Sequence, residues 1–130
     1  MDQALDDLLC QRYPNIFRDR HGTKYETGMC YGFCCGDGWY ELINRLCAEI
    51  SNQVNSGAMP PVVASQVKEK FGSLRFHFRG GNDETRRLIE LASLESEQTC
   101  EQCGRLDDIN HLRAARGLCS VCAAFVKNES

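Results

Sequence analysis

The strongest hydrophobic pattern in the chain runs from Trp39 to Val54. Apolar side chains recur there at helical spacing, at Trp39, Leu42, Ile43, Leu46, Cys47, Ile50 and Val54. A helix with this spacing has one continuous apolar face, which predicts that it lies against the core. We expect Asp37 to cap the helix and Glu41 to favour its first turn, because carboxylates stabilise helix N-termini.

A period of two replaces the helical period between Val62 and Phe78. Leu74, Phe76 and Phe78 alternate with Arg75, His77 and Arg79, which predicts a β-hairpin that turns at Phe71-Gly72. The expected pairs are Lys70 with Ser73, Glu69 with Leu74, Lys68 with Arg75, Val67 with Phe76, Gln66 with His77, and Ser65 with Phe78. Val67, Leu74, Phe76 and Phe78 then share one face of the hairpin. The opposite face, called the cationic face below, carries Lys68, Lys70, Arg75, His77 and Arg79.

Weaker patterns predict two further helices. Residues 3–12 place leucines at helical spacing, with Asp2 as the expected cap and Pro14 ending the segment. Leu88, Leu91 and Ala92 indicate a helix that begins after an Asp83 cap and ends near Glu97. Residues 14–38 follow no regular pattern, but their apolar side chains suggest partial packing against the core.

Two C-x-x-C pairs near the end of the chain predict a metal site. Cys100 and Cys103 precede Cys119 and Cys122, with 15 residues between the pairs, and this spacing is typical of four-thiolate zinc sites. Four protein thiolates leave no open position on the ion, so we expect one zinc ion with a structural role. The alternative is that these cysteines are simply buried or disulfide-linked.

These elements predict an α+β fold in which three helices pack on the hairpin and a zinc ribbon or treble-clef-like knuckle follows. We expect residues 1–98 to form the α+β core and residues 99–130 the zinc-knuckle subdomain, packed together as one unit. The predicted core residues are Trp39, Leu42, Ile43, Leu46, Ile50, Val67, Leu74, Phe76, Phe78, Leu88 and Leu91.

Composition narrows the class of protein. With 130 residues, of which 42% are hydrophobic and 25% charged, the chain suits a single globular domain. A net charge of −3 argues against a protein that coats nucleic acid or anionic membranes through its overall field. The N-terminus lacks the pattern of a signal peptide and no apolar run could span a membrane, so we expect a cytoplasmic protein with reduced thiols.

Enzyme motifs find little support. The three histidines, His21, His77 and His111, fit neither the zinc deaminase pattern nor the metalloprotease pattern. The C-x-x-C-G and L-C-x-x-C strings resemble the zinc scaffold of H-N-H nucleases, but the segment between Cys103 and Cys119 is too short for their catalytic hairpin. We therefore expect no enzymatic activity.

The remaining cysteines leave two alternatives open. Cys34 or Cys35 could be a nucleophile if the following helix lowered a thiol pKa. Cys30, Cys34 and Cys35 could also bind a second metal ion together with Cys10 or His21. The simpler interpretation is that these are buried thiols beside a glycine turn.

The cationic face poses its own question, because like charges directly opposite one another destabilise a strand pair. An acidic neighbour within the chain could neutralise it. The third predicted helix carries Glu84, Glu90, Glu95 and Glu97, and the first carries Asp6 and Asp7 beside Asp2. Otherwise the face would bind an anionic partner, either a phosphate backbone or an acidic protein surface.

Several strings resemble a family of small, largely uncharacterised proteins of phages, prophages and bacterial genomes. The resemblance rests on Tyr13, Pro14 and Phe17, on the run from Gly32 to Trp39, on the run from Gln66 to Phe76, and on C-x-x-C-G with L-C-x-x-C. It covers nearly the whole chain. It implies a phage-associated accessory protein, and it assigns no reaction.

The sequence therefore predicts a protein that acts by stoichiometric binding to a host or phage protein, such as an inhibitor of host defence. The alternative is a zinc-knuckle regulator that binds nucleic acid through its cationic face. For a protein interface we expect aromatic and arginine anchors, namely Arg18, Arg20, Tyr25, Tyr31, Phe33 and Tyr40. The oligomeric state cannot be predicted from these patterns.

Overall fold

The computed structural model describes residues 1–21, 29 and 32–104, where three α-helices accompany a three-stranded sheet. Helix α1 spans Gln3–Arg12, α2 spans Tyr40–Asn55 and α3 spans Asp83–Ser96. The sheet has the strand order β1-β2-β3. The expected α+β class is confirmed, and Cys119 and Cys122 lie outside the described residues.

The predicted hairpin is present as β2, Val62–Lys70, and β3, Ser73–Gly80. Five of the six expected pairs are confirmed, from Lys70 opposite Ser73 to Gln66 opposite His77. The sixth is wrong, because Phe78 pairs with Ala64 and an irregularity between Ala64 and Gln66 leaves Ser65 out of the ladder. A one-residue bulge of this kind follows no hydrophobic pattern.

A third strand, β1, consists of Phe33–Cys34 and runs parallel to β2, with Phe33 opposite Val67. The sequence around Phe33 follows no regular pattern and predicted no strand, so the sheet is larger than the predicted hairpin. Short 3-10 turns at Arg18–His21 and Asp37–Trp39 flank it along the chain.

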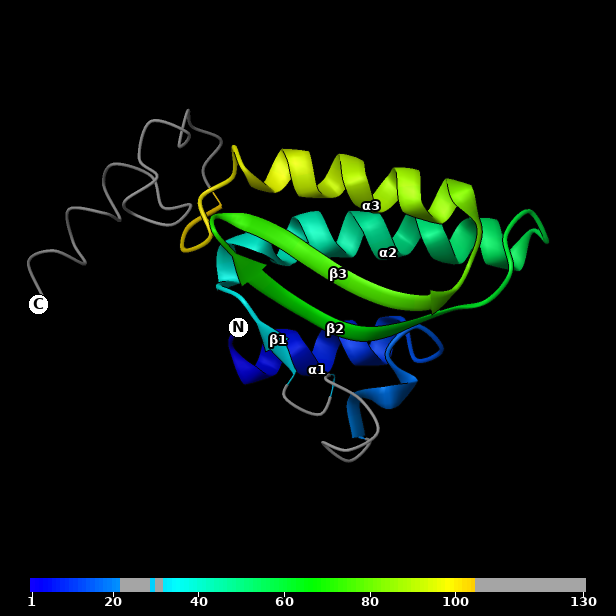
Figure 1. The fold of residues 1–130 in the computed structure, drawn as a ribbon. Coiled ribbons are helices and arrows are strands. Elements are labelled where there is room, and N and C mark those ends of the chain that lie inside the picture. The colour runs from blue at the N-terminus through cyan, green and yellow to red at the C-terminus, as the bar shows by residue number, and fades with distance from the viewer. Residues whose placement is uncertain (22–28, 30–31, 105–130) are drawn as a thin grey trace, which may run out of the picture.

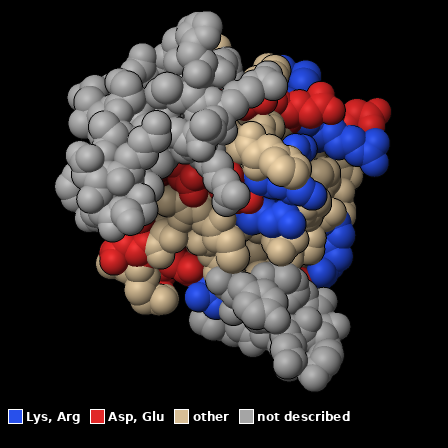
Figure 2. Space-filling view, turned by 60° about the vertical axis from the view of Figure 1, so that its left-hand side comes forward, with Lys and Arg blue, Asp and Glu red and all other residues tan. Residues whose placement is uncertain are grey.

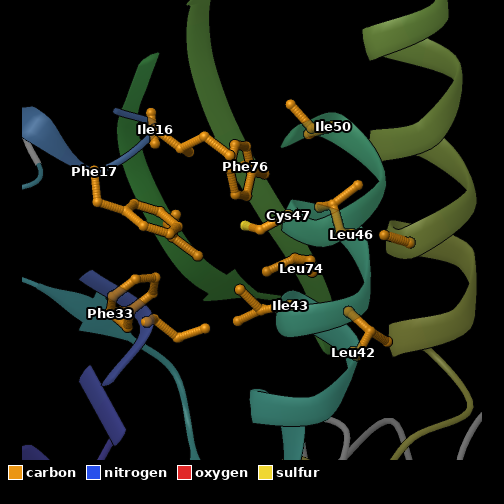
Figure 3. Close-up of a cluster of buried hydrophobic side chains, with 14 of the residues drawn as sticks. Ile16, Phe17, Phe33, Leu42, Ile43, Leu46, Cys47, Ile50, Leu74 and Phe76 are labelled. Carbon is orange, nitrogen blue, oxygen red and sulfur yellow. The ribbon is translucent and has the colours of Figure 1, made fainter. Parts of the chain in front are cut away.

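Helices α2 and α3 lie side by side along the hairpin in Figure 1, while α1 lies near β1 on the other side of β2. The core lies between α2 and the sheet. In Figure 3, Ile43 and Cys47 from α2 point toward Phe17 and Phe33 across Leu74 and Phe76. The Phe17 and Phe33 rings meet edge to face at 4.9 Å between centroids, an arrangement that aromatic pairs prefer.

Most of the predicted core is buried, with one clear error. Leu91 is 50% exposed, and Phe78 and Leu88 are only partly buried. Helix α3 instead buries the small residues Thr85, Ala92 and Ser96, because small side chains let it approach the hairpin closely. The Oγ atom of Ser96 accepts a hydrogen bond from the Leu74 amide at 2.8 Å, which binds α3 to β3.

The expected helix caps are only partly correct. Asn82, not Asp83, caps α3, through a reciprocal pair of hydrogen bonds with Thr85. Asp37 does not cap α2, since its carboxylate accepts a hydrogen bond from the Asp2 amide at 2.6 Å. Asp2 occupies the N-cap position of α1, but its side chain makes no cap hydrogen bond.

Candidate functional site

Residues 99–104, called the knuckle below, carry the first half of the predicted metal site and pack against the α+β core. The Gly104 amide donates to the Cys100 carbonyl at 2.8 Å, and Gly104 has φ +79°. This bond closes a tight turn that contains both Cys100 and Cys103. Cys100 is fully buried and Cys103 is exposed.

The knuckle binds residues 36–39, which directly precede α2, through backbone and side-chain hydrogen bonds. The Gly38 amide donates to the Glu101 carbonyl at 2.7 Å, and the Gly36 amide donates to the Glu101 carboxylate at 2.8 Å. The indole Nε1 of Trp39 donates to the Thr99 carbonyl at 2.9 Å. Two motifs that lie more than 60 residues apart in sequence therefore form one contact.

Glycine at position 38 is required by this contact. A Cβ atom there would lie 2.1 Å from the Cys100 carbonyl oxygen and 2.5 Å from the Gly104 nitrogen. At Gly36 a Cβ atom would lie 2.4 Å from the Glu101 carbonyl oxygen. The two glycines of the Gly-Asp-Gly-Trp string thus allow close approach of two backbones, a use that only glycine permits.

The donor set of the knuckle fits zinc, because two cysteines on a glycine-terminated turn are the usual half of a four-thiolate site. The other half, Cys119 and Cys122, lies outside the described residues. For the second metal site, the described part of the chain contains no cluster of three or more metal-ligating side chains. Cys10, His21, Cys34 and Cys35 therefore do not form such a site by themselves, and Cys30 is not described.

Burial makes two of the remaining cysteines, Cys35 beside the glycine turn and Cys10 on α1, poor nucleophiles. Cys35 is buried, and desolvation raises the pKa of its thiol to about 12. Burial and the nearby Asp6 carboxylate raise the pKa of Cys10 to about 11. Reactive cysteines need a lowered pKa, so the structure offers no support for a nucleophile at Cys35.

Three of the six expected interface residues are buried or paired inside the fold, which corrects that expectation. Phe33 is 4% exposed and Tyr40 is 8% exposed. The guanidinium of Arg20 binds the buried Asp6 carboxylate, with Nε 3.0 Å from Oδ1. Arg18 is exposed, and Tyr25 and Tyr31 lie outside the described residues. The aromatic side chains of Phe33 on β1 and Tyr40 on α2 are part of the buried core.

Four of the five residues of the cationic face are exposed, and Lys68 is half-buried. Along β3, Arg75, His77 and Arg79 are exposed, whereas Leu74 and Phe76 are buried and Phe78 is partly buried, so the predicted alternation is confirmed. Lys68 lies directly opposite Arg75 in the ladder. Figure 2 shows lysine and arginine side chains gathered toward the middle of the face in view, with aspartate and glutamate side chains around them.

Three of the seven acidic residues that were candidates to neutralise this face form ion pairs elsewhere. Asp6 binds Arg20, Glu84 binds Arg87 and Glu95 binds Arg45 at 2.7 Å. One cation of the face is paired internally, since the Arg79 guanidinium lies 2.6 Å from the Asp19 carboxylate. Asp19 comes from the 3-10 turn after α1, where the sequence gave no sign of a partner.

The other cations of the face form no ion pair with any residue that the structure describes; these are Lys68, Lys70, Arg75 and His77. Lys70 lies instead over the ring of Phe71, with its ammonium 5.6 Å from the ring centroid. A cross-strand lysine-arginine pair without a counter-ion costs stability. Among the described residues, these side chains therefore form a positive cluster that has no acidic partner.

Sequence reasoning missed one exposed feature of this surface. Phe71, at the hairpin turn, is 86% exposed. The sequence predicted the turn at Phe71-Gly72, but it did not indicate that the ring would be exposed.

Comparisons of the chain with protein-family models, with curated proteins and with solved structures gave no match. No helix within the described ranges is long and apolar enough to cross a membrane.

Proposed function

We propose that this protein acts by binding, without turnover of its own, and that the cationic face is its contact surface for the phosphate backbone of a nucleic acid. The observation that carries the proposal is the Lys68-Arg75 cross-strand pair, which has no anionic partner among the described residues. An anion placed over this pair removes the repulsion between the two charges.

The burial of the expected anchors favours this partner over a protein docked on the segment before α2. Phe33, Tyr40 and Arg20 are used inside the fold, so the main support for that interface is lost. Because the net charge is −3, the long-range field does not attract a polyanion. The affinity must then come from local contacts, which salt weakens strongly.

Binding of a labelled oligothymidylate of about 20 nucleotides tests the proposal, since one such surface covers roughly 4–16 nucleotides. Fluorescence anisotropy should show that Lys68→Ala and Arg75→Ala each weaken binding. Each should also reduce the steepness of the logarithmic salt dependence by about 0.7, the value per phosphate contact on a single strand.

Arg86→Ala is the matched control, because Arg86 is an exposed arginine on α3 whose partner is Asp83 at 3.7 Å. It removes the same charge from a different surface, and binding should change little. Equal losses of affinity in all three variants would mean that binding depends only on the net charge of the protein. If the wild type shows no salt-sensitive binding, the proposal is refuted.

A protein partner is the second candidate, and one observation favours it. Leu91 and Leu94, one turn apart on α3, are 50% and 61% exposed. Exposed leucines on one helix face are typical of protein contacts. Capture of a host or phage protein that survives nuclease treatment and is lost in Leu94→Glu would support this candidate.

We also propose that Cys100, Cys103, Cys119 and Cys122 bind one zinc ion with a structural role, forming a ribbon or treble-clef-like unit. The glycine-closed turn around Cys100 and Cys103 supports this. A cytoplasmic location, a phage or prophage origin and a role as an inhibitor of host defence stay predictions from the sequence.

A further inference from the structure

Phe71 occupies an unfavourable backbone position at the tip of the hairpin. Its φ angle is +56°, and the following Gly72 has φ +83°. Two successive positive φ angles define the tight hairpin turn in which asparagine, aspartate and glycine are strongly preferred. A bulky side chain in this region is an outlier.

The fold gives no reason for a phenylalanine at this position. The ring is 86% exposed, so burial does not offset the backbone strain. The turn is held by other groups, because the Gly72 amide donates to the Glu69 carboxylate at 3.1 Å and Lys70 pairs with Ser73. Asparagine would satisfy the same turn at lower cost. Strain that the fold does not explain points to function.

The surroundings of the ring indicate which function. The Lys70 ammonium lies 5.6 Å from the ring centroid. Lys68 follows at the next position on the same face of β2, about 6.6–6.8 Å along the strand, with Arg75 directly across from it. The exposed ring of Phe71 therefore lies at one end of a row of cationic side chains.

We propose that Phe71 stacks on an unpaired base while Lys70, Lys68 and Arg75 contact the adjoining phosphates, so that the surface selects single-stranded nucleic acid. The inference rests on the proposed function and specifies its ligand. Single-strand binding surfaces combine a positive track along the backbone with aromatic rings on which bases stack.

Duplex and protein ligands fit the tip less well. Bases in a duplex are already stacked on one another and are not available to a protruding ring. An acidic protein surface satisfies the cations but leaves the phenyl ring without a partner unless it also offers an apolar pocket. Every unpaired base offers a flat apolar face beside a phosphate, which matches both parts of the surface.

The test compares three variants at position 71 by fluorescence anisotropy, with labelled oligothymidylate, the corresponding duplex and poly-L-glutamate as probes. Phe71→Asn should weaken oligothymidylate binding about 5- to 150-fold, the range for loss of one stacked base. Phe71→Tyr and Phe71→Trp keep a stacking ring and should bind as the wild type does. The wild type should prefer oligothymidylate to the duplex.

Thermal unfolding of the same variants controls for damage to the fold. Phe71→Asn should melt at the same temperature as the wild type or higher, since asparagine followed by glycine suits the turn. Weaker binding in a variant that is at least as stable cannot come from unfolding.

The possible failures can be separated. If Phe71→Asn binds oligothymidylate as tightly as the wild type, but Lys68→Ala binds it more weakly, stacking is refuted and the cationic-face proposal stands. If the wild type binds poly-L-glutamate as tightly as oligothymidylate, the surface is a general polyanion site and single-strand selection is refuted. If the wild type binds none of the probes, both proposals fail.

Discussion

The Asp6-Arg20 pair shows how single residues join the N-terminal helix to the strand that follows it. Asp6 is buried, and its carboxylate accepts from the Arg20 guanidinium and from the Phe33 amide at 3.4 Å. Gly32 makes room for the cluster, because a Cβ atom there would lie 2.5 Å from Asp6 Oδ2. Nothing in the sequence links an aspartate on one amphipathic helix to an arginine in an irregular segment, so this pair could not be predicted.

Arg20→Ala should destabilise the protein strongly, which reverses the expectation for an interface residue. The substitution leaves the Asp6 carboxylate buried without its charge partner. Breaking a buried pair in this way costs about 3–5 kcal/mol, and the 18% side-chain exposure of Arg20 favours the lower end. Chemical denaturation gives the free energy of unfolding.

Arg18→Ala is the control for this prediction, since the Arg18 side chain is 61% exposed and lies 3.9 Å from Asp19. Surface substitutions of this kind usually change stability by about 0.5 kcal/mol or less. Equal stability losses in the two variants would mean that the buried pair has no special contribution.

At the scale of elements, the sequence predicted those whose pattern is repeated many times. Helix α2 and the register of the hairpin are examples, because each rests on six or more side chains that keep one period. The period is helical in α2 and alternates between core and solvent in the hairpin. The short strand β1 has only Phe33 and Cys34, too few for any period. Leu91 misled the core prediction for α3, which instead buries the small side chains of Thr85, Ala92 and Ser96.

The contact between the knuckle and the Gly36–Trp39 segment was also beyond sequence patterns, although both strings were recognised. Each of its hydrogen bonds uses at least one backbone group, which carries no sequence signature, and it depends on two glycines that could equally have been turn formers. The structure explains why glycine occupies both positions, because the two backbones approach each other too closely for a Cβ atom.

Gly38→Ala should detach the knuckle from the core. The added methyl group would overlap the Cys100 carbonyl and the Gly104 amide, and overpacking of this kind costs about 1–3 kcal/mol or more. Trp39 is the only tryptophan and its indole donates to Thr99. Its emission should therefore shift to longer wavelength as the knuckle separates and water reaches the ring.

Gly57→Ala separates steric overlap from backbone strain. Gly57 has φ +85°, but no atom lies within 4 Å of an added Cβ, so only the cost of the left-handed conformation applies, about 1–2 kcal/mol. Its tryptophan emission should match the wild type. An unchanged emission in Gly38→Ala would show that the contact does not hold the knuckle in place.

For the whole molecule, charge is distributed in a way that composition cannot reveal. The chain has a net charge of −3, yet several of its carboxylates pair with arginines on α2, α3 and the turn after α1. Of the cations on β2 and β3, Arg79 pairs with Asp19, whereas Lys68, Lys70 and Arg75 form no ion pair with a described residue. The sequence predicted which residues share the face, because alternation sets it, but not which acids neutralise it, because ion pairs depend on tertiary distances.

The last prediction concerns zinc and the stability of the whole molecule. The knuckle covers Gly38 and gives Trp39 its hydrogen-bond acceptor, so an ion that holds the knuckle also holds the start of α2. Structural zinc contributes about 10–16 kcal/mol in small zinc fingers, comparable with the whole stability of about 5–15 kcal/mol for a domain. A zinc chelator should therefore lower the melting temperature of the entire chain and shift the emission of Trp39.

Metal analysis of two serine variants identifies the ligands. Cys103→Ser should lose the ion and reproduce the effect of the chelator. Cys34→Ser changes an exposed cysteine outside the knuckle, and it should keep about one zinc per chain. Loss of the ion in Cys34→Ser with retention in Cys103→Ser would move the metal to the cysteines before α2. If the chelator changes neither the melting temperature nor the Trp39 emission, the knuckle is stable without metal and the structural role assigned to zinc is wrong.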